Sequence, residues 1–555
     1  MFPLLALAFL AASLKVRRAG FLLVGVLLAN AWAWFVANWP LRSLYGLLTS
    51  TDRVGNLALV QVVAAGNPLL QMPQAGQLTF EPFWSVLVAV VSGFDPERVL
   101  ALYPFLPLVM ILAFAGSLHL SLRGGDASTG AWSGWECVTI AAFATLLSSA
   151  PFEYAGTYRL PWPMTFLLKP NHALGLVLLP PLLRAFAEIR GWRSRIAVGV
   201  LLQLLGWVFV IHMAFVAAGL LVFAAASVLS RHPDWRRDST DAVCVIGVNV
   251  LVVSPYLVML AVGYPFLYAS PRAAIPPFSP HLLEASLKQG LLFWLGLWGC
   301  VVAWRRGDRL SRVLVTQLAA AYAIWASVLL LSLLQIARER DEIYYWVRIL
   351  TAAVAGIGAW DLARRVAQRL ALETKAAALA TFLFAAALPW SLPYWWDPLL
   401  MDSYVPGSLE PLPDRLRLPT DFIRRNTAPA AIFAGDRDYA RFVAALGARR
   451  VTLADNLHAP KNYAERVALE EALVFDGDGS IALPLARSLG VSYFVATRRL
   501  LGAWAPRADV PAGQTARSLP RRADFDARPY LARVFLWEGP ERDFVAIYRI
   551  AERAP

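Results

Sequence analysis

The first 394 residues consist of long apolar blocks separated by short polar turns, whereas residues from 395 onward have the mixed composition of a water-soluble domain. A helix that crosses a bilayer needs about 20 apolar residues, and this length predicts about twelve spans here. We expect the run 196–230 to divide near His212, because it is too long for one span. The candidate spans are 2–14, 21–39, 99–121, 135–150, 170–187, 196–210, 213–230, 241–262, 287–304, 313–336, 346–363 and 376–394.

The first apolar block resembles the core of a signal peptide in length. However, its basic residues (Lys15, Arg17 and Arg18) follow the block rather than precede it, and a second apolar block begins at Phe21. This order favours a short span over a cleaved signal.

Residues 395–555 predict a small α/β domain, because short helical and strand patterns alternate along them. A linker rich in Pro and Asp is expected to extend to about Pro419. Helical patterns cover 421–426, 438–446 and 463–474, and strand patterns cover 431–434, 450–453, 490–495, 532–537 and 544–550. No Gly-rich phosphate-binding motif opens any of these helices, so no nucleotide site is expected. The predicted fold is an α-helical polytopic membrane domain (1–394) followed by this domain.

Basic residues occur mainly in every second loop. These are Lys15, Arg17, Arg18, Arg123, Arg190, Arg193, Arg195, Arg231, Arg236, Arg237, Arg305, Arg306, Arg309, Arg312, Arg364, Arg365, Arg369 and Lys375. Because loops rich in Lys and Arg stay in the cytoplasm, the other loops and the C-terminal domain are expected to face outward. Tryptophans such as Trp346 fall at the outward ends, where indole rings favour the membrane interface.

The chain is 58% hydrophobic and 16% charged, and its formal net charge is +13. Much of the positive excess lies at the ends of apolar blocks, where it sets membrane orientation, so nucleic acid is not an expected partner. The three cysteines, Cys137, Cys244 and Cys300, lie in or beside apolar blocks without metal-type spacing. They are interpreted as small hydrophobic residues.

The first outward loop, 40–98, carries two acidic candidates. Its segments 54–65 and 82–91 have the patterns of helices that lie along a membrane surface. Asp52 precedes the first segment, where it could cap the helix or act as a general base, and the residue alone does not decide between the two. Glu81 precedes Pro82, which favours the first turn of a helix, so Glu81 could equally mark a helix start.

Two further outward loops carry polar clusters. The first cluster is Glu153, Tyr154, Tyr158, Arg159, Lys169, Asn171 and His172, and the second is Arg338, Arg340, Asp341, Glu342, Tyr344, Tyr345 and Arg348. Lys169 could simply extend its charged end to the interface. Arg348 lies inside the start of a span, where a charge costs about 2.5–3.5 kcal/mol, so we expect it to have a partner or a function.

Carboxylates, cations and tyrosines thus occur together at one membrane depth. This combination suits the attack of a hydroxyl on a sugar attached to a lipid phosphate, which needs a base and cations for the departing phosphate. No metal-ligating cluster is evident in the sequence, although a pair of carboxylates could hold one divalent cation.

Several of these segments resemble the GT-C superfamily of integral-membrane glycosyltransferases, including its dolichyl-phosphate-mannose and aminoarabinose transferase branches. The segments are Thr51-Asp52-Arg53, Asn56–Val60, Gly66-Asn67-Pro68, Phe80–Trp84, Lys169–Ala173, Asp341–Tyr345 with Arg348, Arg424–Asp436 and Leu489–Val495. The sequence departs from the family pattern at two positions. Asn56 stands where many relatives have His. Arg53 follows Asp52, so the adjacent acidic pair of the protein mannosyltransferase branch is absent.

The resemblance implies an inverting transferase in the bacterial cytoplasmic membrane that takes sugar from a polyprenyl-phosphate donor to a lipid, glycan or protein acceptor. It implies Asp52 as the general base, Arg348 and Lys169 as partners of the leaving phosphate, and Glu81 as a residue that orients the acceptor. Further expected substrate contacts are Glu153, His172, Glu342 and Tyr344.

Two other functions stay open at this stage. A transporter or flippase of lipid-linked sugars would carry charges deep in several spans, whereas the charges here lie mostly at span ends. A catalytically silent relative could instead act as an assembly scaffold. For the C-terminal domain, a packing role and a role as a lid or acceptor-binding module are both possible.

Overall fold

The structure, a computed structural model, describes residues 51–68, 72–74, 82–103, 106–123, 132–147, 170–263, 289–334, 341–371, 376–387, 412–454, 462–503 and 521–551. The chain forms two compact units. Unit 1 comprises Met1–Trp39, Phe105–Tyr256 and Arg272–Pro406, and unit 2 comprises Pro40–Pro104, Leu257–Pro271 and Gly407–Pro555. The predicted spans 2–14 and 21–39 lie outside the described residues.

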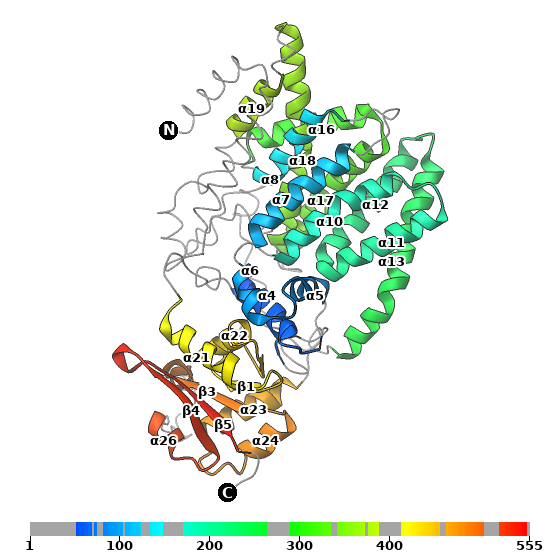
Figure 1. Cartoon of the computed structure of the whole chain (residues 1–555). Coiled ribbons are helices and arrows are strands. Elements are labelled where there is room, and N and C mark those ends of the chain that lie inside the picture. The colour runs from blue at the N-terminus through cyan, green and yellow to red at the C-terminus, as the bar shows by residue number, and fades with distance from the viewer. Residues whose placement is uncertain are drawn as a thin grey trace. The chain divides into compact units, whose positions relative to one another are not determined.

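Unit 1 is a helical bundle (Figure 1). Its described helices are α7 (Leu106–Arg123), α8 (Gly134–Leu146), α10 (Pro170–Ala187), α11 (Trp192–Val208), α12 (Val210–Leu229), most of α13 (Trp235–Gly263), α16 (Leu291–Arg306), α17 (Arg309–Leu333), α18 (Asp341–Arg369) and α19 (Ala376–Ala387). Helix α18 packs against α8, α16, α17 and α19, and its apolar stretch is almost entirely buried. It is therefore the central helix of the unit.

Glycines allow α18 to approach its neighbours at backbone distance. A β-carbon on Gly358 would lie 2.1 Å from the Leu295 carbonyl oxygen of α16, and one on Gly356 would lie 2.6 Å from the Ile140 Cα of α8. Small residues at such contacts are typical of helix packing in membranes, where close backbone approach increases van der Waals attraction.

Four helices in the described part of the chain are long and apolar enough to cross a membrane. They are Val210–Leu229, Trp235–Pro255, Arg309–Leu333 and Trp346–Arg369. The total of about twelve therefore stays a prediction. The expected division of the run 196–230 is confirmed: α11 ends at Val208 and α12 begins at Val210, with Phe209 in an extended conformation between them.

The basic turns of unit 1 meet at one end of the bundle. Asp241 of α13 accepts hydrogen bonds from Arg195 of α11 (2.6 Å) and Arg309 of α17 (2.6 Å). Nearby, Asp238 accepts a hydrogen bond from Arg312 at 2.9 Å. Since these residues lie at the starts of their helices, the three turns share one face, as the charge pattern predicts. The compartment that this face contacts stays a prediction.

Unit 2 contains a five-stranded mixed sheet with the strand order β2-β1-β3-β5-β4. Strands β1, β2 and β3 are parallel, whereas β5 runs antiparallel to β3 and β4. The strands are β1 (Ile432–Gly435), β2 (Arg450–Val451), β3 (Tyr493–Thr497), β4 (Leu531–Glu538) and β5 (Phe544–Ile550). The accompanying helices are α21 (Asp414–Asn426), α22 (Arg437–Ala445), α23 (Tyr463–Phe475), α24 (Ala482–Ser488), α25 (Arg498–Ala503), α26 (Arg522–Asp526) and the short η6 (Pro540–Arg542).

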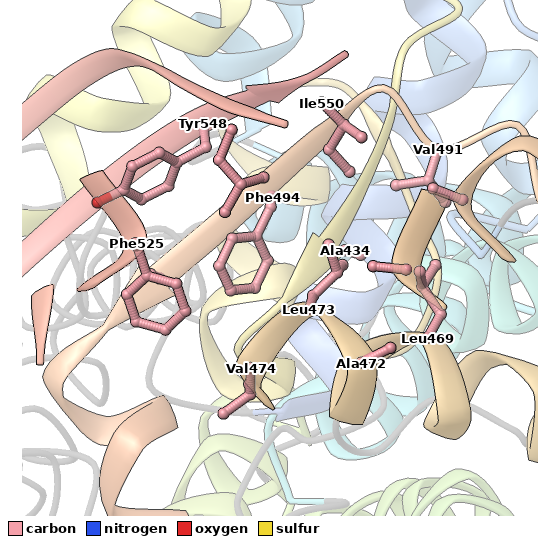
Figure 2. Close-up of a cluster of buried hydrophobic side chains, with 14 of the residues drawn as sticks. Ala434, Leu469, Ala472, Leu473, Val474, Val491, Phe494, Phe525, Tyr548 and Ile550 are labelled. Atoms are coloured by element: carbon pink, nitrogen blue, oxygen red, sulfur yellow. The ribbon is translucent and has the colours of Figure 1, made fainter. Parts of the chain in front are cut away.

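The core of the C-terminal domain lies between the sheet and α23. Figure 2 shows Leu469 and Leu473 of this helix beneath the sheet residues Phe494 and Tyr548. The Phe494 ring lies 5.5 Å from that of Phe525, and burial of such aromatic and aliphatic surface is the main stabilising contribution. The expected small α/β domain is thus present.

The linker predicted to extend to about Pro419 is shorter than expected, because α21 already begins at Asp414 and contains Pro419. A proline inside a helix leaves the carbonyl four residues earlier without its usual donor. Here that carbonyl belongs to Arg415, and it accepts a hydrogen bond from the Tyr439 hydroxyl at 2.8 Å. This tertiary contact therefore permits a helix at Pro419, where the sequence pattern alone predicted a linker.

The first outward loop contributes helices α4 (Thr51–Ala64), α5 (Pro82–Val91) and α6 (Pro96–Leu102) to unit 2. The two surface helices predicted at 54–65 and 82–91 are thus present as helices. Most described side chains of α4, from Val54 to Ala64, are buried, because α5 and α22 pack against it (Figure 1).

Candidate functional site

The first turns of α18 carry the candidate residues that the structure describes best. Trp346 and Arg348 are only 1% and 0% exposed. The expectation that Trp346 lies at the membrane interface is therefore wrong: its ring stacks on Phe215 of α12 at 5.2 Å. Tertiary packing removes this indole from the interface that its sequence position suggested.

Trp346 belongs to an aromatic–histidine cluster, defined here as His172, Phe209, His212, Phe215 and Trp346. The His172 ring lies 3.7 Å from that of Phe209, and His212 lies 4.9 Å from Trp346. Both histidines are at least nine-tenths buried. The cluster joins the first turns of α10, α12 and α18, because the break at Phe209 turns the chain so that His212 faces the other two helices.

A polar cluster, defined here as Gln289, Tyr322, Arg348 and Thr351, lies along the next turn of α18. The Tyr322 hydroxyl is 3.1 Å from the Thr351 hydroxyl and accepts a hydrogen bond from the Gln289 amide at 3.4 Å. Arg348 interacts electrostatically with Tyr322. Arg348 and Thr351 share one helix face, because residues three apart are neighbours on a helix.

The structure brings some predicted site residues together. His172 and Arg348 belong to the two clusters, and Glu342 and Tyr344 lie on the first turn of α18, where only their backbone is described. Glu81, Glu153 and Lys169 lie outside the described residues.

Asp52 belongs to unit 2, whereas the two clusters belong to unit 1. It is the second residue of α4, and its backbone alone is described. Because α4 begins at Thr51, Asp52 lies in the first turn of the helix, and its choice between a structural and a catalytic role stays a prediction. A carboxylate in the first turn is still favoured by the partial positive charge of a helix N-terminus.

Sequence reasoning missed His212, Gln289, Tyr322 and Thr351 as members of the site. His212 was recognised only as a turn position, and a lone histidine beside apolar residues gives no signal of its own. Gln289 lies at the expected outward end of its span, and Tyr322 and Thr351 lie within apolar runs. None of these positions marks the residue as part of a site. The packing of α16 and α17 against α18 brings Gln289, Tyr322 and Thr351 together, and the α12 rings that contact Trp346 place His212 in the other cluster.

The two clusters lie at the opposite end of the bundle from the basic turns. Arg348 and Arg365 both belong to α18, and their spacing corresponds to roughly 25 Å at the rise of an α-helix. A guanidinium keeps its charge at any physiological pH and offers a planar fork that fits phosphate oxygens. Among the described residues no group of three or more His, Cys, Asp and Glu could hold a metal ion.

Comparison with solved structures identifies the fold. Archaeal oligosaccharyltransferase AglB from Archaeoglobus fulgidus, solved with an inhibitory peptide and a dolichol-phosphate, has a TM-score of 0.53 and 14% identity. That comparison covers 94% of this chain and 74% of AglB. ArnT from Cupriavidus metallidurans, solved with undecaprenyl phosphate, has a TM-score of 0.54 and 12% identity, covering 95% of this chain and 97% of ArnT.

The apo structure of the same ArnT gives a TM-score of 0.52 and 13% identity, over 95% of this chain and 98% of ArnT. No protein-family model and no curated protein matches the sequence. The chain therefore shares its fold with AglB and ArnT. The expected resemblance is thereby confirmed for the fold, and the four long apolar helices support a membrane location.

Proposed function

We propose that this protein is a membrane glycosyltransferase that moves a sugar from a polyprenyl-phosphate donor to a lipid, glycan or protein acceptor at the outward face of a bacterial cytoplasmic membrane. The observation that carries the proposal is the buried Arg348 in the polar cluster, within a fold shared with AglB and ArnT. AglB was solved with a dolichol-phosphate and ArnT with undecaprenyl phosphate, which are both polyprenyl phosphates.

In the proposed reaction Asp52 accepts the proton of the acceptor hydroxyl as the hydroxyl oxygen attacks the anomeric carbon. The bond between that carbon and the phosphate oxygen breaks, and polyprenyl phosphate leaves with the electron pair. Attack from the side opposite the leaving group inverts the anomeric centre. Arg348, together with Lys169, stabilises the negative charge of the departing phosphate.

The other expected site residues would bind substrate rather than react. Glu81 would orient the acceptor. Glu153, His172, Glu342 and Tyr344 would contact the sugar or the acceptor. No step requires a divalent cation, although one held between carboxylates would strengthen binding of the phosphate. Repeating the assay below with a chelator tests for such an ion.

The decisive experiment is a transfer assay with purified protein, reconstituted in nanodiscs with polyprenyl-phosphate sugars. Products would be detected by mass spectrometry, and the acceptor class would come from glycolipid and glycan profiles of cells with and without the gene. Asp52→Asn should abolish transfer and leave the melting temperature unchanged. Unaltered transfer by this variant would refute the assigned base.

A matched control comes from the same loop. Asp95 caps α6 by accepting a hydrogen bond from the Glu97 amide at 2.9 Å. Asparagine is about as good a helix cap as aspartate, so Asp95→Asn should transfer sugar at the wild-type rate.

The same assay distinguishes the transferase from the two alternatives. In the described helices, Asp238, Arg312 and Arg348 are buried charged residues that lie in the first two turns or so rather than at mid-span, which favours a transferase over a flippase. In protein reconstituted into liposomes, a flippase would move labelled donor from one leaflet to the other without forming product. A scaffold would do neither.

A further inference from the structure

The C-terminal domain and the first outward loop form one structural unit although more than 300 residues separate them in the chain. Helix α22 of the C-terminal domain packs against α4, the helix that carries Asp52 (Figure 1). Three separate contacts connect the first outward loop to the C-terminal domain.

The first contact closes the C-terminal end of α4. Gly66, with φ +85°, and Asn67 end the helix by donating backbone hydrogen bonds to Val63 (3.0 Å) and Val62 (3.3 Å), in the pattern of a Schellman motif. The buried Asn67 amide also donates to the Val62 carbonyl at 3.0 Å and to the Pro429 carbonyl of the C-terminal domain at 3.4 Å. Asn67 therefore joins the helix end to the segment before β1.

The second contact extends the sheet. The Val451 amide of β2 donates a hydrogen bond to the Pro73 carbonyl at 2.9 Å, and Gln74 pairs with Val451 as a parallel bridge. Gln74 is 1% exposed. The loop thus supplies a short additional pairing at the β2 edge, which would otherwise present unpaired backbone groups.

The third contact passes through Arg424 of α21. Its Nε donates to the Glu97 carboxylate of α6 at 2.7 Å, while its other nitrogens donate to Asp421 and to the Leu446 carbonyl, both at 2.6 Å. The Arg424 side chain is only 9% exposed, whereas the Glu97 side chain is 53% exposed. Helix α6 is joined in turn to α4, because the Gln61 amide donates to the Pro96 carbonyl at 3.0 Å.

We infer that the C-terminal domain positions α4, and with it the general base Asp52, and that Asn67 and Glu97 are positioning residues. This inference rests on the proposed function. An α-helix is stiff, so a rotation of its closed end displaces the other end, where Asp52 lies roughly 20 Å away. A misplacement of about 1 Å of a reacting group costs up to about 100-fold in rate.

The test compares Asn67→Ala and Glu97→Gln with Glu538→Gln in the full-length protein. Glu538 is a suitable control, because it is exposed and pairs with Arg522 within the C-terminal domain, away from the first loop. Amide hydrogen exchange of α4 should accelerate in the first two variants and not in the control. The kcat for transfer should fall between about threefold and 100-fold with little change in the donor KM.

Two further variants separate positioning from simple loss of stability. Glu97→Asp keeps the carboxylate and should retain more activity than Glu97→Gln. In an Asp52→Glu background, where the base is already displaced, Asn67→Ala should lower kcat by a much smaller factor than in the wild type. Equal factors in the two backgrounds would show that Asn67 does not act through Asp52 and would overturn the inference.

The outcomes distinguish this inference from the proposed function. If wild-type protein transfers no sugar while Asn67→Ala still accelerates exchange in α4, the proposed function fails and the structural connection stands. If wild-type protein transfers sugar and the variants loosen α4 without lowering kcat, the positioning role is wrong. Unchanged exchange in both variants would also overturn it.

Discussion

The imidazole of His212 lies so close to Gly175 that a β-carbon at position 175 would be 2.4 Å from Nδ1. No real β-carbon approaches a heavy atom at this distance, so alanine at position 175 must displace the His212 ring. Because His212 packs on Trp346 and Phe209, its displacement would disturb the whole aromatic–histidine cluster. We predict that Gly175→Ala lowers the transfer rate at least about tenfold, as measured in the nanodisc assay.

Gly116→Ala is the control for this prediction. A β-carbon on Gly116, also in a helix of the bundle, meets nothing within 4 Å. Alanine is a better helix former than glycine, so this variant should keep wild-type transfer and melt at the same temperature or slightly higher. Equal rates for the two alanine variants would exclude a functional role for the His212 position.

The next prediction concerns the charge of Arg348. Arg348→Gln removes the cation and should lower kcat by about 100- to 1,000-fold, the usual effect of deleting a group that stabilises transition-state charge. Arg348→Lys keeps a charge but loses the planar fork, so its rate should lie between those of the glutamine variant and wild type. The exposed Arg236 in the first turn of α13 provides the control Arg236→Gln, which should leave the rate unchanged. A wild-type kcat in Arg348→Gln would remove this residue from the mechanism.

The ion-pair cluster at the basic end predicts an effect on stability. Asp238 is fully buried and accepts hydrogen bonds from Arg312 and Ser227, both at 2.9 Å. Asp238→Asn leaves the buried Arg312 without that negative charge, and breaking such a pair typically costs about 3–5 kcal/mol. The variant should melt at a clearly lower temperature in detergent. Asp234→Asn, at an exposed position before the same helix, should melt like the wild type.

A pH effect follows from Tyr530 in the C-terminal domain. Burial raises the pKa of Tyr530 to about 12, and its hydroxyl donates to the Asp476 carbonyl at 2.6 Å. In the unfolded chain this tyrosine would lose its proton near pH 10. The raised pKa therefore contributes stability that is fully present below pH 10 and is lost as pH rises toward 12.

Tyr530→Phe tests this effect, because phenylalanine has no proton to lose. We predict that the melting temperature of the wild type falls more steeply than that of the variant between about pH 10 and pH 12, with the difference between them shrinking as pH rises. Circular dichroism of the purified full-length protein measures both curves. Parallel curves would show that the buried hydroxyl is not linked to folding.

Local pattern predicted most of the elements that the structure describes. The apolar blocks 313–336 and 346–363 became the long helices α17 and α18, and the strand pattern at 544–550 became β5. Hydrophobic periodicity and length suffice for these elements, because each buries a continuous apolar face or stripe. The resemblance of a few short motifs also predicted the fold, which the comparisons with AglB and ArnT confirm.

Long-range contacts explain where the sequence was insufficient. Pro419 indicated a linker, yet it lies inside α21, because the Tyr439 hydroxyl replaces the donor that proline lacks. Trp346 indicated an interface residue, yet it is buried against Phe215. In both cases a partner distant in the chain changes the environment of the residue, and no local pattern contains that partner.

By itself the sequence determined a membrane body with a soluble C-terminal domain, because the length and apolarity of segments are local properties. Only the tertiary structure placed His212 beside His172 and gathered Tyr322 and Thr351 around Arg348. Only the tertiary structure joined the loop that carries Asp52 to the C-terminal domain through Asn67 and the pair of Arg424 with Glu97. These contacts depend on the packing of helices and strands that lie far apart in the chain, and packing is decided by three-dimensional complementarity rather than by the order of residues.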